Sequence, residues 1–91
     1  MTILLDSVSV DSESDSVAAT GPIFLSILGN TNGSIEVTAD IGSGESVAYR
    51  KLSIDPISFV RLEFYSGVSF KVYARGIKST ESVTIEYINA D

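Results

Sequence analysis

The stretch that most constrains the fold runs from Ile57 to Arg75, with the sequence ISFVRLEFYSGVSFKVYAR. Apolar and polar residues alternate on both sides of a Ser-Gly pair, which is typical of two half-buried antiparallel strands joined by a turn. Both apolar sets share one face if Phe64 pairs with Val68 and Gly67 takes a left-handed conformation in the loop. We therefore predict a central hairpin. Its inward residues would be Val60, Leu62, Phe64, Val68, Phe70, Val72 and Ala74.

Further predicted strands lie on either side of this hairpin, and no window shows helical periodicity. They are Thr2–Val10, Ile23–Leu28, Ser34–Asp40, Val47–Ile54 and Glu81–Ile88. Most of them alternate with period two, whereas Ile23–Leu28 is a continuous apolar run, short enough for a buried strand. Gly, Pro, Asn, Asp and Ser residues separate them at the short, regular intervals that are typical of β-sandwiches. We predict an all-β chain that forms one domain over residues 1–91. It would be a small antiparallel β-sandwich, immunoglobulin-like or jelly-roll-like, of about seven strands.

Three parts of this pattern are irregular. Asp6 interrupts the first segment, so residues 1–10 are predicted as an edge strand, or as an arm that swaps onto a neighbouring copy. Residues 11–22 form a polar spacer, which we predict as a loop. In the Val47–Ile54 segment the apolar residues change from odd to even positions at Arg50-Lys51, which predicts a β-bulge or a break at that point.

The composition argues against several classes of function. The chain contains no cysteine, which excludes disulfides and thiolate metal sites, and no histidine, the commonest general base. Its formal net charge of -6 argues against nucleic-acid binding, which requires a basic surface. The N-terminus lacks the features of a signal peptide, and no apolar run approaches the roughly 20 residues of a membrane span. We therefore expect a non-enzymatic protein without cofactors, made in the cytoplasm, that binds neither nucleic acid nor membranes.

The main candidate for a binding surface is the outer face of the predicted hairpin. Aromatic and arginine side chains, which are enriched among the residues that dominate protein interfaces, gather there. The alternative is that aromatic and charged cross-strand pairs stabilise a sheet face exposed to solvent. In this arrangement Arg61 would repel Lys71 unless Glu63 or an acid from a second copy intervenes. The candidate residues are Phe59, Arg61, Lys71, Tyr73 and Arg75.

The polar spacer contains a second candidate, the acidic residues Asp11, Glu13 and Asp15. Their alternate spacing is that of a calcium loop, which also requires glycine at its sixth position and an acid at its twelfth. Ser16 and Pro22 occupy those positions here, so we expect no metal. The run is interpreted either as a solvated loop or as a second contact, because no Lys or Arg precedes Arg50 and these acids would suit the basic residues of another copy.

The order of these segments also carries a resemblance. It lies in the opening strand TILLDSVSV, the spacer DSESDSVAATGP, the segment GNTNGSIEVTAD, and the closing VRLEFYSGVSFKVYARG and SVTIEYINAD. In this order the chain resembles the small β-sandwich virion proteins encoded among the structural genes of tailed bacteriophages. The tryptophan often found in the middle loop of such proteins is missing, and Ser46-Val47-Ala48-Tyr49 stands there instead.

The resemblance implies a non-enzymatic structural role on the virion. The leading hypothesis is a capsid decoration (cement) protein that binds a capsid or tail protein and, as a homo-oligomer, itself. The alternative is a carbohydrate-binding or cell-surface-binding module of a phage fibre or tail accessory, in which Tyr49, Phe59 or Tyr73 would serve as an aromatic platform. A third hypothesis is an acidic domain that regulates a host protein by mimicking nucleic acid, for which the charge is modest.

Overall fold

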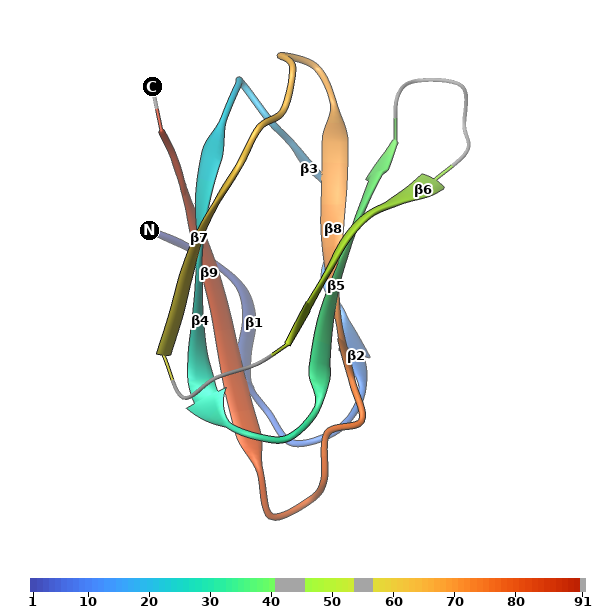
Figure 1. Ribbon diagram of the computed structural model, residues 1–91, viewed down its shortest axis with the longest axis vertical. Coiled ribbons are helices and arrows are strands. Elements are labelled where there is room, and N and C mark those ends of the chain that lie inside the picture. Colours follow the sequence, from blue (N-terminus) through green and yellow to red (C-terminus); the bar gives the residue numbers. More distant parts are fainter. Residues whose placement is uncertain (41–45, 54–56, 91) are drawn as a thin grey trace.

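The computed structural model describes residues 1–40, 46–53 and 57–90, and these residues form strands and no helix. The strands are β1 (Thr2–Val8), β2 (Ser12–Glu13), β3 (Val17–Ala18), β4 (Ile23–Asn30), β5 (Ser34–Asp40), β6 (Ser46–Ser53), β7 (Ile57–Leu62), β8 (Ser69–Arg75) and β9 (Ser82–Asn89). They build a four-stranded sheet and a five-stranded sheet, all antiparallel, that pack face to face (Figure 1). The predicted small β-sandwich is confirmed.

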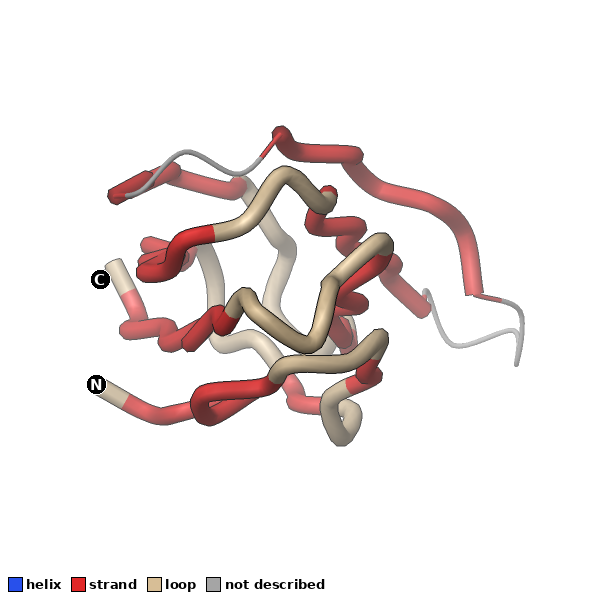
Figure 2. The backbone as a smooth tube through the Cα atoms, turned by 90° about the horizontal axis from the view of Figure 1, so that it is seen from below, coloured by secondary structure: helices blue, strands red, loops and turns tan. Residues whose placement is uncertain are grey.

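The strand order shows how the chain winds through the two sheets. The four-stranded sheet has the order β1-β9-β4-β7, and the five-stranded sheet has the order β2-β8-β5-β6, with β3 also paired to β8. The first half of the chain thus pairs with the second half in reverse order, and successive pairs alternate between the sheets. Figure 2 shows the backbone of the sandwich from one end. With β2 and β3 taken as one interrupted strand, this is the order of a jelly roll.

The predicted central hairpin is wrong. β7 pairs with β4 in one sheet, whereas β8 pairs with β5 in the other. The segment between them crosses from sheet to sheet, and Phe64 stacks on Phe70 across the core with ring centroids 5.0 Å apart. Two strands that face one core from opposite sheets have the same alternation as two strands of a hairpin, so parity alone does not separate the two arrangements. Gly67 does take a positive φ of 91°, in a turn closed by Val68 N–H donating to Tyr65 O.

The inward residues, in contrast, follow the predicted parity. In β4, β5, β8 and β9 the alternate apolar side chains are buried, as expected for half-buried strands. They form one core: Leu5, Ala19, Ile23, Leu25, Ile27, Ile35, Val37, Ala39, Leu62, Phe64, Phe70, Val72, Ala74, Ile77, Val83 and Ile85. The predicted bulge is also present, one residue earlier, because Arg50 pairs with Val37 and Ala48 with Thr38, which leaves Tyr49 unpaired.

Both irregular N-terminal regions run along sheet edges. β1 is an edge strand, as predicted, and it pairs with β9 of its own chain, with register shifts on either side of Leu5. The polar spacer is not simply a loop, because β2 and β3 pair with β8. Ser14 joins these two short strands: its buried hydroxyl accepts a hydrogen bond from Val72 N–H at 3.0 Å, and its own N–H donates to Val72 O. The alternation of serine with acidic residues thus makes a polar edge strand.

Glu81 fastens the connection between the two sheets at one end of the sandwich. Its carboxylate accepts hydrogen bonds from Thr31 Oγ1 and Asn32 N–H in the β4–β5 loop, and from Lys78 N–H. These bonds, led by the one from Lys78, lower the pKa of the Glu81 carboxyl from its ordinary value. In the same loop Gly33 lies so close to Arg75 that a Cβ atom there would be 2.4 Å from the Arg75 carbonyl oxygen, which only glycine tolerates.

Candidate functional site

The outer face of the four-stranded sheet carries exposed apolar side chains on every strand. We call it the apolar face; it comprises Ile3, Phe24, Leu28, Phe59 and Ile88. Phe59 is 59% exposed, Ile3 53%, Ile88 46% and Leu28 40%. Scattered exposed apolar residues are ordinary on a protein surface, whereas a contiguous group marks an interaction site.

The strand register and the ring stacking bring Ile88, Phe24 and Phe59 side by side on the apolar face, whereas Glu86 and Ser26 separate Ile3 from Phe59. Phe24 on β4 lies opposite Ile88 on β9 and opposite Arg61 on β7. Residues directly opposite each other in antiparallel strands share one face, so this row lies on a single surface. The next row along the strands is Ile3, Glu86, Ser26 and Phe59, one residue from each strand of the sheet.

Phe24 and Phe59 form the centre of the apolar face. Their rings stack with centroids 5.1 Å apart and an interplanar angle of 18°. The Arg61 guanidinium lies 6.0 Å from the centroid of Phe24, and its Nε forms an ion pair of 2.7 Å with Glu63. An aromatic pair bordered by arginine is the composition that dominates binding energy at protein interfaces.

The outer face of the five-stranded sheet is different in kind. We call it the charged face; it comprises Glu13, Glu36, Lys71, Tyr73 and Arg75. Lys71 pairs with Glu13 at 2.6 Å and Arg75 pairs with Glu36 at 3.1 Å. The hydrogen bond that the Lys71 ammonium donates to Glu13 raises the pKa of Lys71, and a hydrogen bond to Tyr73 adds to the effect. Lys71 and Arg75 are therefore already paired within the chain, whereas Lys51, opposite Glu36 on the same face, forms no ion pair with a described residue.

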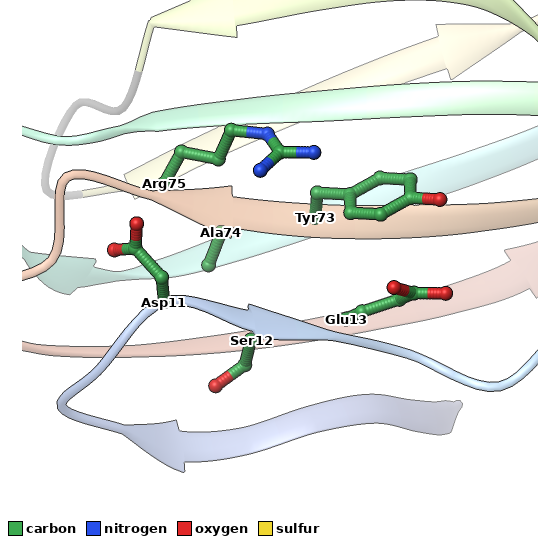
Figure 3. A pocket seen from close by; sticks show the side chains of 6 residues that line it. All are labelled: Asp11, Ser12, Glu13, Tyr73, Ala74 and Arg75. Atoms are coloured by element: carbon green, nitrogen blue, oxygen red, sulfur yellow. The ribbon is translucent and has the colours of Figure 1, made fainter.

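Tyr73 is flanked along its strand by these two cations. The Arg75 guanidinium lies 4.7 Å from the ring centroid and the Lys71 ammonium lies 5.6 Å from it, both within cation–π range. Beside this arrangement is an open groove of about 200 Å³, lined by Asp11, Ser12, Glu13, Tyr73, Ala74 and Arg75 (Figure 3). Ligand sites commonly span about 300–1,000 Å³, so this groove is small for one.

The structure divides the predicted hairpin surface into two parts on opposite sides of the sandwich. Phe59 and Arg61 lie together on the apolar face, whereas Lys71, Tyr73 and Arg75 lie together on the charged face. The expected repulsion between Arg61 and Lys71 is wrong for the same reason. Each cation instead has an acid of its own chain beside it.

The three acidic candidates of the spacer have separate surroundings. Glu13 pairs with Lys71, Asp11 accepts a hydrogen bond of 2.9 Å from Ile77 N–H, and Asp15 is exposed. Parts of the two predicted binding surfaces therefore meet. Asp11 and Glu13 of the acidic run line the same groove as Tyr73 and Arg75 of the predicted hairpin surface. Among the described residues, no group of three or more acidic side chains is close enough to hold a metal ion.

Four members of the apolar face were not expected from the sequence: Ile3, Phe24, Leu28 and Ile88. The run Ile23–Leu28 reads as a continuously buried strand, but the structure buries only Ile23, Leu25 and Ile27. The single polar residue of the run, Ser26, is the signal that identifies the outward parity. The side chain of Tyr49, a predicted aromatic platform, lies outside the described residues.

Comparison of the chain with family models, curated protein sequences and solved structures finds no significant match. The described residues also contain no helix long and apolar enough to cross a membrane. Function is therefore inferred from the two outer faces and their chemistry.

Proposed function

We propose that this chain is a non-enzymatic structural protein of a virion, most simply a capsid decoration protein that binds a capsid or tail protein and other copies of itself. The observation that carries the proposal is the apolar face, on which exposed Phe59 stacks on half-buried Phe24. A contiguous apolar group of this kind loses its contact with water when a protein partner covers it, which favours binding.

The fold supports this proposal only by analogy. Jelly rolls occur in viral capsid domains, in lectins and in other proteins, so the strand order alone assigns no function. The surface chemistry favours a protein partner over a sugar. Tyr73 has a cation within cation–π range on each side along its strand, so its ring is not a free platform of the kind sugar recognition uses.

Co-purification with virus particles tests the proposal. Particles from cells that carry the gene would be banded on a density gradient and analysed for the chain by mass spectrometry. We expect the chain in the particle band, and a Phe59→Ala chain depleted from it relative to a Tyr73→Ala control. Absence of the unsubstituted chain from the particles would contradict the proposal, and binding to a glycan array would favour the carbohydrate-binding alternative.

A further inference from the structure

We infer that the apolar face binds a second copy of this chain, face to face, about a two-fold axis close to the direction of β4. This inference names a partner for the surface on which the proposed structural role rests. The charges on the face make it self-complementary, and the charged face offers no comparable surface. Isologous contacts of this kind are the commonest way in which identical chains associate.

The position of β4 defines the symmetry. β4 lies between β9 and β7 in the four-stranded sheet. A two-fold axis along β4, in the plane between two copies, places β7 of each copy over β9 of the other. Packed sheets keep their strands within about 30° of each other, so an axis close to β4 gives a normal sandwich contact.

The charges on the two sides of β4 complement each other across this axis. Glu86 lies on β9 in the row of Ser26 and Phe59, and its side chain has no ion pair or hydrogen bond within the described part of the chain. Arg61 lies on β7, one row away. In the paired arrangement Arg61 of each copy, which already pairs with Glu63 of its own chain, covers Ile88 of the other copy and reaches its Glu86 as a second acid, while Phe59 lies over that Glu86. A carboxylate covered without such a cation would oppose association, because burial of an unpaired charge is costly.

The net charge of the chain opposes self-association, and least so where the charges at the contact are close to balance. The chain carries 12 acids against 6 bases, so copies repel one another on average. On the apolar face the charges nearly balance, because Arg61 is accompanied by Glu63 and Glu86. Lys71 and Arg75 of the charged face pair with Glu13 and Glu36, as Arg61 of the apolar face pairs with Glu63.

The size of the face sets the expected affinity. With strands about 4.8 Å apart and a rise of about 3.3 Å per residue, the sheet presents about 400 Å² per copy. A pair would then bury about 800 Å², below the roughly 1,200–2,000 Å² of stable complexes. We therefore expect a weak dimer, with a Kd on the order of 100 µM, that a particle presenting many copies would promote.

Sedimentation equilibrium over about 10 µM to 1 mM tests the inference. The unsubstituted chain should show a monomer–dimer equilibrium, and Phe59→Ala should weaken the dimer by about tenfold or more. Tyr73→Ala, the matched control on the charged face, should leave it unchanged. Circular dichroism would verify that both variants remain folded.

A charge exchange tests the proposed axis. Arg61→Glu and Glu86→Arg should each weaken the dimer, and the double variant should restore it, because the two positions meet only across the interface. A dimer lost in Tyr73→Ala and kept in Phe59→Ala would overturn the inference, as would a double variant no better than either single one.

A chain that remains monomeric over the whole concentration range would also overturn the inference, and the particle experiment then separates it from the proposed function. Depletion of Phe59→Ala from particles, without any dimer in solution, would retain the structural role and assign the face to another virion protein. Absence of both dimer and particle binding would reject the two together.

Discussion

The two outer faces of the sandwich cover the same core and are both formed by antiparallel strands, yet they expose different kinds of side chain to solvent. On the charged face, Lys71 and Arg75 each have an acid of the same chain within 3.1 Å, and both flank Tyr73. On the apolar face, Phe59 and Ile88 expose about half of their surface. A face whose charges are paired internally gains little from a partner, whereas an exposed apolar face gains from being covered. The difference identifies which side of the molecule carries binding.

The largest expected effect separates the core from the apolar face. Phe70 is fully buried and contacts the rings of Phe64 and Tyr87. Phe70→Ala should lower the free energy of unfolding by about 3–5 kcal/mol, because it removes a buried ring and leaves a cavity. Phe59→Ala deletes the same atoms from an exposed position and should cost less than about 1 kcal/mol. Chemical denaturation would measure both, and equal losses would show that Phe59 belongs to the core.

The next effect concerns only the edge of the five-stranded sheet. Ser14→Ala leaves the buried Val72 N–H without its hydroxyl acceptor, which costs about 1–3 kcal/mol. Ser16→Ala, at an exposed position two residues further on, should be nearly neutral. Dimer formation by Ser14→Ala should be normal wherever the variant is folded, since the apolar face is on the other sheet. If Ser14→Ala is fully folded but no longer forms the dimer, the two faces are not independent as proposed.

A smaller effect tests the carboxylate that joins the sheets. The pKa of Glu81 is lowered in the folded chain, so its contribution to stability is present above the unfolded value near 4.5 and is lost as the pH falls through the folded pKa. Glu81→Gln should therefore unfold at a lower temperature than the unsubstituted chain at pH 7. This difference in unfolding temperature should become smaller below about pH 4.5. Thermal melts across a pH series measure it. Glu86→Gln is the matched control, and a gap of equal size there would mean that the hydrogen bonds of Glu81 contribute nothing.

The smallest effect concerns the ion pairs of the charged face. Glu13→Gln removes the acid beside Lys71, and exposed pairs contribute little, so only a slight loss of thermal stability is expected. That loss should disappear at high salt, where exposed charges are screened. Asp15→Asn provides the comparison, because Asp15 is exposed and has no cation partner among the described residues. A large loss of thermal stability that persists at high salt would mean that the Glu13–Lys71 pair contributes more to stability than an exposed ion pair should.

Much of the fold was predictable from local pattern. The all-β class, the boundaries of the long strands and the buried parity of Ile35, Val37 and Ile85 follow from period-two alternation. The bulge was expected within one residue of its position at Tyr49. The candidate site was predictable only in pieces: Phe59 and Arg61 were identified, whereas Phe24 was hidden within an apolar run that reads as buried throughout.

The sequence by itself determined which side chains face inward, because alternation along a strand is a local property of the extended backbone. Only the tertiary structure decided which strand each one pairs with. Leu62 and Phe70 both face the core, and this holds whether their strands are neighbours in one sheet or lie in opposite sheets. The wound order of the chain selects the second arrangement. It therefore places Phe59 and Tyr73 on opposite sides of the molecule, since outward residues of opposite sheets point away from each other.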